Sequence, residues 1–264
     1  MADPTPPSAG PTRRGAIIAA AGLATVLPAV ARASEWLHDP VVFYTDVALR
    51  PVLEQLGATY LREHGIVWRV YAAAPINSLG LLAHGTQDDV LITLAPDAAQ
   101  AEASGLIAPG RRPLWRTTLV FAALGAPGPL ADFSPRALLD AIGGGRLAIT
   151  DPTPTAAFKG YDVLARAGLA SQVDNRTVGA IDTEQAAGML RTGDATVALL
   201  HASEAATLPG LRALMPVPPT AYDPIDYEVA LTKSAWSRNQ ARAIAYLEGL
   251  QGDDLRGLGL ELLA

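Results

Sequence analysis

The chain has 264 residues, of which 50% are hydrophobic and 17% charged, a composition that excludes an intrinsically disordered protein. The formal net charge of −6 comes with no stripe of Lys or Arg, so nucleic acid is not expected as a partner. The sequence contains no cysteine, which excludes disulfides, thiol nucleophiles and cysteine-ligated zinc or iron–sulfur clusters.

The N-terminal residues 1–33 are predicted to form a signal peptide that is removed after Ala33. Arg13 and Arg14 stand directly before the apolar run GAIIAAAGLATVLPAVARA, a partial match to twin-arginine export signals that leaves the general secretory route open. A membrane anchor is the alternative interpretation. The apolar run is shorter than the ~20 residues that a span requires, and Pro28 interrupts it. We therefore expect a mature protein that folds outside the cytoplasm.

Strands and helices alternate in the first half of the mature chain. Strands are expected over 40–45, 67–73 and 89–95, where β-branched, aromatic and aliphatic residues cluster. Helices are expected over 50–65, 77–85 and 96–107. In the first helix, Pro51 suits the opening turn and Gly65 is a natural stop.

The alternation continues in the second half. Strands are predicted over 116–125, 145–152, 196–205 (its end entering a helix), 211–218 and 227–233. Helices are predicted over 135–145, 156–173, 183–195 and 239–263, with Asp182 as an N-cap and Gly193 as a stop. This order of elements indicates an α/β protein with mostly parallel sheets.

Several stretches, taken in order, resemble the molybdate-binding protein family among the type II periplasmic substrate-binding proteins of ABC importers. They include VVFYTDVALRPVLEQL, LLAHGTQDDVLIT, TTLVFAALG, RLAITDP, DTEQAAGMLRTGDATVALLHASEA and YEVALTKSA. The resemblance implies a two-lobed α/β fold with a ligand cleft between the lobes and two crossover strands. One lobe would comprise 34–118 and 225–264, and the other 119–224, with the crossovers near 117–123 and 226–232.

The resemblance also implies a site in which helix starts and hydroxyl groups hold a small oxyanion without counter-charges, and this sequence departs from that pattern. The first family serine corresponds to Ala48 and the second to Pro75 or, with a one-residue gap, to Ile76, just before Asn77 and Ser78. The family tyrosine corresponds to His201. The remaining implied contacts fall on Ala156 or Ala157 and on Thr183, and Thr45 and Asp46 complete the predicted ligand-binding set.

Two of these residues have simpler interpretations. Asp46 follows a strand, where a turn or helix cap is its commonest role, and its carboxylate would repel a dianion unless it points away or is paired. His201 at a strand end can be a hydrogen-bonded structural histidine. Because the hydroxyl donors are lost, a different anion or a metal species bound by His201 and Asp46 stays open beside molybdate or tungstate.

No catalytic motif accompanies this pattern. The sequence has no G-x-S-x-G elbow, no H-E-x-x-H and no P-loop, and the glycine-rich IGGGRLAI precedes a strand instead of following one. We therefore predict no enzyme activity, no cofactor and no resident metal. The resemblance implies a periplasmic monomer that delivers its ligand to an ABC permease in the inner membrane. A sensor or accessory protein on the same scaffold is the alternative.

Overall fold

The computed structural model describes residues 39–73, 80, 82–84, 89–125, 129–130, 133–150 and 158–263. The predicted signal peptide lies outside these ranges, as does most of the helix predicted over 77–85. Of the predicted site residues, Asn77, Ser78 and Ala156 also lie outside the described residues.

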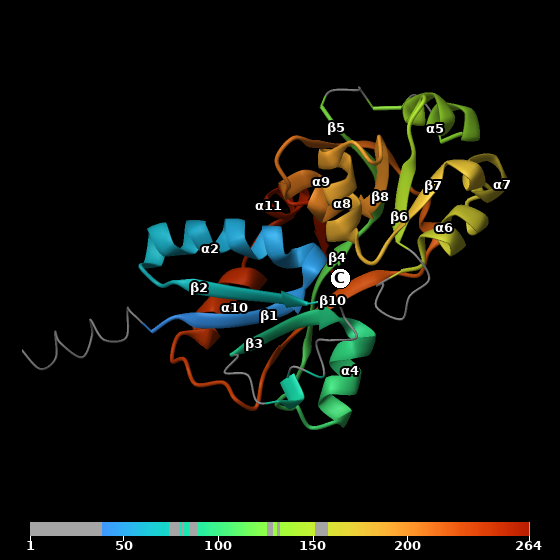
Figure 1. Cartoon of the computed structure of the whole chain (residues 1–264). Coiled ribbons are helices and arrows are strands. Elements are labelled where there is room, and N and C mark those ends of the chain that lie inside the picture. The colour runs from blue at the N-terminus through green and yellow to red at the C-terminus, as the bar shows by residue number, and fades with distance from the viewer. Residues whose placement is uncertain are drawn as a thin grey trace, which may run out of the picture.

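A six-stranded sheet forms the centre of what we call the first lobe (Figure 1). Its strand order is β11-β4-β10-β3-β1-β2. Strand β1, next to the edge strand β2, pairs in parallel with β2 and β3, whereas β10 runs antiparallel to β3 and β4, and β11 antiparallel to β4. The bounds of the strands are β1 Val41–Asp46, β2 Trp68–Ala73, β3 Val90–Leu94, β4 Arg112–Thr117, β10 Ile225–Leu231 and β11 Leu260–Leu262.

A five-stranded sheet in the order β7-β6-β8-β5-β9 forms the centre of the second lobe. Here β6 is parallel to β7 and β8, while β5 is antiparallel to β8 and β9. The bounds are β5 Leu119–Leu124, β6 Leu147–Thr150, β7 Thr177–Ala180, β8 Val197–His201 and β9 Leu211–Pro216. The prediction of mostly parallel sheets is therefore wrong, because both sheets are mixed.

The antiparallel strands arise where the chain passes between the sheets. The single residue Thr118 separates β4 of the first sheet from β5 of the second. The predicted strand over 116–125 is thus two strands in different sheets. The chain returns through residues 217–224, which contain η3 (Pro219–Ala221), and enters β10. Neither passage contains an α-helix of the kind that connects parallel strands. The strands that these passages join therefore need not run parallel to their neighbours.

Helices cover both faces of each sheet (Figure 1). In β1, Val41 and Phe43 face a core shared with α2 and α10, and Tyr44 faces the opposite core beside α4. This alternation is the two-residue period of a strand covered on both sides. The helices near the first sheet are η1 Val47–Leu49, α2 Arg50–His64, α4 Ala95–Ala103, α10 Gln240–Glu248 and α11 Gly252–Gly257.

In the second lobe, α8 and α9 cover one face of the sheet, and α5, α6 and α7 cover the other. Their bounds are α5 Pro135–Ile142, α6 Gly160–Arg166, α7 Ala170–Val173, η2 Asp174–Arg176, α8 Thr183–Thr192 and α9 Ala202–Thr207. The predicted Asp182 cap and Gly193 stop of α8 are confirmed. The helix predicted over 156–173 is broken, because Gly168 adopts a φ of +71° between α6 and α7.

Asp89 holds three separate segments of the first lobe together. It is fully buried, and its Oδ2 accepts the N–H of Val42 at 2.9 Å. Its Oδ1 accepts the N–H groups of Trp236 at 2.8 Å and Ser237 at 2.7 Å. A single side chain therefore fixes β1 and the segment before α10 against the start of β3.

We predict that Asp89→Ala lowers the free energy of unfolding by at least about 3 kcal/mol, since it leaves three backbone donors without an acceptor. Asp89→Asn should cost less, because one amide oxygen still accepts hydrogen bonds. The control is Asp140→Ala, which removes an exposed carboxylate 3.9 Å from Arg136 and should cost under about 0.5 kcal/mol. Urea unfolding followed by circular dichroism measures all three. Equal losses in Asp89→Ala and Asp140→Ala would contradict this role.

Candidate ligand-binding site

The end of β1 carries the first part of the candidate site. Asp46 is the N-cap of η1, with φ −65° and ψ 146°, and its Oδ1 accepts the N–H of Ala48 at 2.8 Å. The capping interpretation of Asp46 is therefore confirmed. Ala48, at the position of the first family serine, contributes its backbone N–H, which donates to the Asp46 carboxylate.

The end of β8 carries the second part. His201 is fully buried, and its backbone N–H donates to Oε2 of Glu204 at 3.1 Å. The imidazole Nδ1 lies 3.4 Å from the same oxygen. The ring of Phe158 packs edge-on against the imidazole, with 5.4 Å between the centroids. The imidazole thus lies between this carboxylate and this ring, although neither ring nitrogen forms a hydrogen bond to a described residue.

The start of α8 carries the third part. Thr183 is the first residue of α8 and is buried, while Asp182 caps the helix by accepting the N–H of Gln185 at 2.7 Å. Both α8 and α9 pack against η1, so the start of α2 in the first lobe meets two helices of the second. The fold thus gathers Asp46, Ala48 and His201 at the junction of the lobes, and brings the helix that begins at Thr183 against them.

Buried polar atoms concentrate at this junction. We call the following set the buried polar cluster: the side chains of Thr45, Asp46, Thr93, His201, Ser203, Glu204 and Tyr227, all at most 2% exposed. Several of their atoms have no hydrogen-bond partner among the described residues, namely Asp46 Oδ2, both ring nitrogens of His201, Tyr227 Oη and the hydroxyls of Thr45, Thr93 and Ser203. Buried polar groups normally find a partner, so this concentration marks the junction as a candidate site.

Sequence reasoning missed Thr93, Ser203, Glu204 and Tyr227. A local signal existed for Glu204, which stands three residues after the cap position His201, the spacing of a capping box. Tyr227 has no such signal. It belongs to β10, which only the fold places beside β3.

Burial sets the electrostatics of the cluster. Removal from water raises the pKa of the Asp46 carboxyl to about 6, helped by the negative charges of Glu204 and Asp97 and opposed by His201. Burial, together with Asp46 and Glu204, also raises the pKa of the Tyr227 hydroxyl well above its ordinary value. Two like charges 4 Å apart repel by about 4 kcal/mol at an effective dielectric constant near 20. A dianion beside these carboxylates would therefore be opposed while both are ionised.

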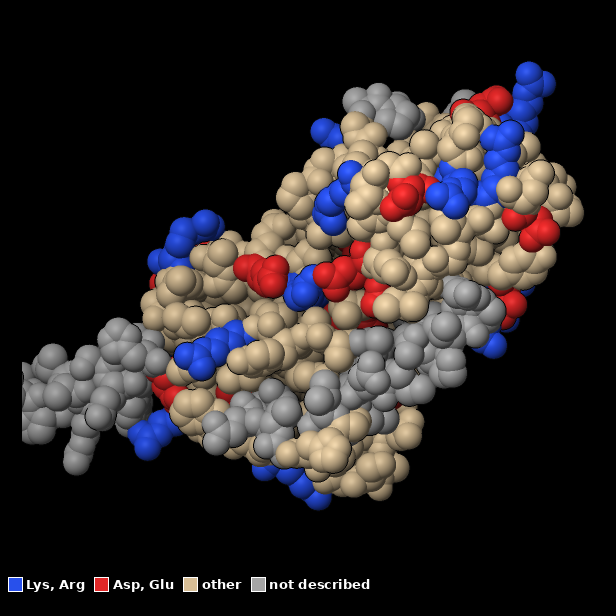
Figure 2. Space-filling view, in the orientation of Figure 1, with Lys and Arg blue, Asp and Glu red and all other residues tan. Residues whose placement is uncertain are grey.

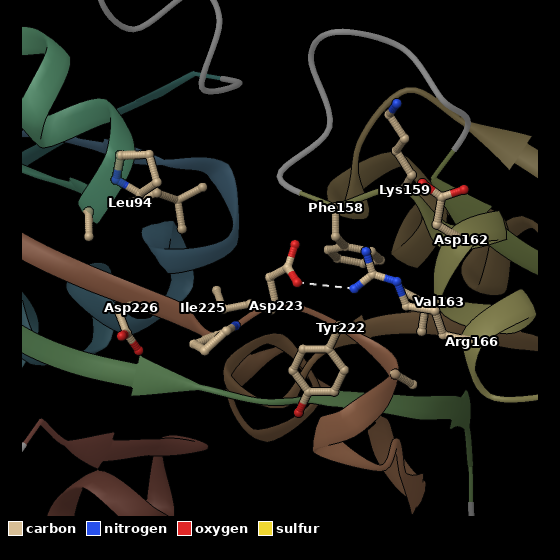
Figure 3. Close-up of a pocket in the computed structure, with 14 residues that line it drawn as sticks. Leu94, Phe158, Lys159, Asp162, Val163, Arg166, Tyr222, Asp223, Ile225 and Asp226 are labelled. Atoms are coloured by element: carbon tan, nitrogen blue, oxygen red, sulfur yellow. Dashed lines mark hydrogen bonds and ion pairs between the residues drawn. The ribbon is translucent and has the colours of Figure 1, made fainter.

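An open cavity of about 540 Å³ lies between the lobes (Figure 3). The start of α4 and residues 225–226 of β10 line it from the first lobe, and Phe158, Lys159 and Arg166 line it from the second. Asp223 lies between them and pairs with Arg166 at 3.0 Å. Phe158 lines the cavity and also packs on His201, so this ring lies between the cavity and the buried polar cluster, none of whose residues line the cavity.

Charged side chains also meet across the outer edge of this junction. Acidic and basic groups lie side by side where the two lobes meet in the space-filling view (Figure 2). An ion pair between Arg50 of α2 and Glu184 of α8, both partly exposed, links the two lobes. In the described part of the chain, no group of three or more His, Cys, Asp or Glu residues could hold a metal ion. None of the helices described is long and apolar enough to cross a membrane.

Solved structures with the same fold come from several bacteria. The periplasmic molybdate-binding protein of Azotobacter vinelandii is similar with a TM-score of 0.69 and 20% identity, over 85% of this chain and 100% of that chain. Peb3 of Campylobacter jejuni, in a structure with bound L-phospholactate, has a TM-score of 0.64 and 14% identity, over 84% and 100% of the two chains. The sulfate-binding protein of Mycobacterium tuberculosis has a TM-score of 0.60 and 12% identity, over 86% and 88%.

These likenesses confirm the predicted two-lobed α/β fold of type II periplasmic binding proteins. No curated protein matches the sequence. The family described as bacterial extracellular solute-binding protein matches residues 41–258, most of the chain, and it is a family of binding proteins and not of enzymes. The chain therefore belongs to the bacterial extracellular solute-binding protein family.

Proposed function

We propose that this protein is exported, captures a small oxyanion in the cleft between its lobes and delivers it to an ABC permease. The observation that carries the proposal is the buried polar cluster, in which the ends of β1 and β8 meet. Ligands of α/β proteins bind beyond the carboxyl ends of parallel strands, and both strands end here next to helix starts. A desolvated set of hydroxyl and imidazole groups can supply hydrogen bonds to an anion.

The size of the cavity widens the range of ligands. About 540 Å³ falls within the 300–1,000 Å³ typical of small-molecule sites and leaves room beyond a single tetrahedral ion. Its wall carries two cations, Lys159 and Arg166, and three carboxylates, those of Asp162, Asp223 and Asp226, so the wall as a whole does not select an anion. The structural relatives named above were found with, or are named for, molybdate, sulfate and L-phospholactate, all of which carry oxyanion groups. The shared chemistry favours an oxyanion without fixing molybdate or tungstate.

The remaining parts of the proposal follow from the family. We propose that residues 1–33 form a cleaved signal peptide and that the protein acts in the periplasm as a monomer. Residues 34–118 and 225–264 would move as one lobe and 119–224 as the other, closing around the ligand. A bound metal species has less support, because the described residues include no metal-holding group.

The first test is a thermal-shift screen of the mature protein against molybdate, tungstate, sulfate, phosphate and divalent cations. A ligand present at 100 times its Kd should stabilise the protein by about 2.7 kcal/mol, a rise in Tm of about 5–10 °C. The screen should be run at pH 5.5 and pH 7.5, because Asp46 has a pKa of about 6. The oxyanion proposal is wrong if no oxyanion raises Tm at either pH, and a shift by cations alone would favour the metal alternative.

The second test concerns His201. We predict that His201→Ala weakens oxyanion binding between about 10-fold and 150-fold, since a hydrogen bond to a charged group contributes about 1.5–3 kcal/mol. His64→Ala is the matched control, because that histidine lies on α2 with a third of its side chain exposed. Isothermal titration calorimetry gives the affinities. If the two variants bind as tightly as the wild type, His201 does not contact the ligand.

A further inference from the structure

Gly259 of the first lobe lies directly against the backbone of α9 in the second lobe, with no side chain between them. We propose that this contact is the pivot on which the two lobes turn, and that Gly259 is a positioning residue which sets the distance between the ends of β8 and β1. The pivot itself does not depend on the identity of the ligand, whereas its effect on binding rests on the proposed function.

The closeness of the contact is measured by the space that it leaves for a methyl group. A Cβ placed on Gly259 would lie 2.3 Å from the carbonyl oxygen of Ala202, 2.4 Å from its carbonyl carbon and 2.6 Å from the backbone nitrogen of Ser203. Non-bonded carbon atoms normally stay about 3.5–4.0 Å apart. Gly259 also has a φ of +67°, a conformation that strains residues with a side chain. Glycine is therefore required for the two backbones to approach this closely.

The contact lies on the first passage between the sheets. Oγ1 of Thr117, the last residue of β4, donates to the carbonyl of Gly259 at 3.0 Å. The carbonyl of the next residue, Thr118, accepts the N–H of Ala202 at 2.8 Å. Two consecutive residues of the passage thus hold the two sides of the contact, one from each lobe. A rotation of the lobes about this passage must therefore turn Gly259 against Ala202.

The second passage is joined to the first beside this contact. The N–H of Leu119, at the start of β5, donates to Oη of Tyr222 in the returning segment at 3.3 Å. Leu119 also lies opposite His201, the residue that precedes Ala202. Both connections between the lobes therefore meet close to Gly259, as expected for the axis of a hinge motion.

Away from the passages, the lobes meet through side chains. Both α8 and α9 pack against η1, α9 packs against α2, and the partly exposed Arg50 and Glu184 form an ion pair. A partly exposed ion pair contributes little free energy, so it can part and form again as the lobes move. A contact between two backbones cannot yield in this way. Gly259 and Ala202 therefore fix the point about which the outer contacts open and close.

The same contact positions the candidate site. Ala202 and Ser203 directly follow His201, and the imidazole and the Ser203 hydroxyl belong to the buried polar cluster. Asp46, at the end of β1, supplies part of the cluster from the first lobe. A methyl group on Gly259 requires α9 to retreat by roughly 1 Å. That retreat separates the two parts of the cluster, and a binding site tolerates displacements of only about 0.5 Å.

The experiment measures the distance between the lobes by pulsed electron paramagnetic resonance. Because the chain has no cysteine, Glu63→Cys on α2 and Arg136→Cys on α5 place spin labels at two exposed positions and nowhere else. In this background, Gly259→Ala in the ligand-free mature protein should lengthen the mean distance by at least about 3 Å, because a displacement at a pivot grows with distance from it.

Gly65→Ala is the matched control. Gly65 has a φ of +70°, and a methyl group there meets no described neighbour within 4 Å. This variant therefore carries the same backbone strain as Gly259→Ala without the clash. The distance between the labels should stay at the wild-type value.

Binding gives a second measurement. Isothermal titration calorimetry with molybdate, sulfate and inorganic phosphate identifies which of these ions bind the wild type. For each such ion, Gly259→Ala should raise Kd at least about tenfold, because the parts of the cluster are displaced. Gly65→Ala should change Kd less than about twofold, because the cluster keeps its geometry.

Thr117→Val tests the contact without adding a clash. Valine has nearly the shape of threonine but cannot donate to the carbonyl of Gly259, so the segment before β11 is held less firmly. The mean distance between the labels should stay the same, and the distribution of distances should widen. If Gly259→Ala fails to fold, this variant decides the question.

The outcomes separate this inference from the proposed function. An unchanged distance in Gly259→Ala would overturn the pivot, since α9 would then have moved within its own lobe. An equal change in Gly65→Ala, or a distribution in Thr117→Val as narrow as that of the wild type, would overturn it as well. A changed distance with unchanged Kd would overturn the positioning role. If none of the three ions binds the wild type, the proposed function fails, and the distances still decide the pivot.

Discussion

The hydrogen bond from the N–H of Ala48 to the carboxylate of Asp46 is the constraint around which the site is arranged. It lies at the end of β1, at the start of η1 and α2, and at the junction of the two lobes. A helix start can bind an anion, because its first N–H groups have no hydrogen-bond partners within the helix. In this protein the carboxylate of Asp46 accepts one of these N–H groups, so an anion bound at this helix start would lie beside a carboxylate.

The fold concentrates other polar groups around this carboxylate. β8 ends at His201, and β10 brings Tyr227 to the same junction. The passage through Thr118 leads directly from the end of β4 to the start of β5. The first residue of β5, Leu119, lies opposite His201 in the second sheet. The backbone N–H of Ala202 donates to the carbonyl of Thr118, which fixes α9 directly to this passage. The groups of the cluster are therefore positioned by the segments that join the lobes.

Local signals in the sequence were sufficient for most of the elements and for some of the site. The cap at Asp182, the stops at Gly65 and Gly193 and the capping role of Asp46 depend on residues adjacent in the chain. The break at Thr118 could not be predicted, because β4 and β5 form one apolar, β-rich run and only their partners assign them to different sheets. The short strand β11 exists through its pairing with β4, and the nearness of Tyr227 to Asp46 is equally a property of the whole fold.

The burial of the Asp46 carboxyl is the central claim, and its pKa measures that burial most directly. The Asp46 signal in a carboxyl-carbon NMR titration of the ligand-free protein can be assigned by its loss in Asp46→Asn. The structure predicts an apparent pKa of about 6 for this residue. A value near 3.9, that of an aspartate in water, would contradict the account, because the carboxylate would then be solvated and would impose no condition on the charge of the ligand.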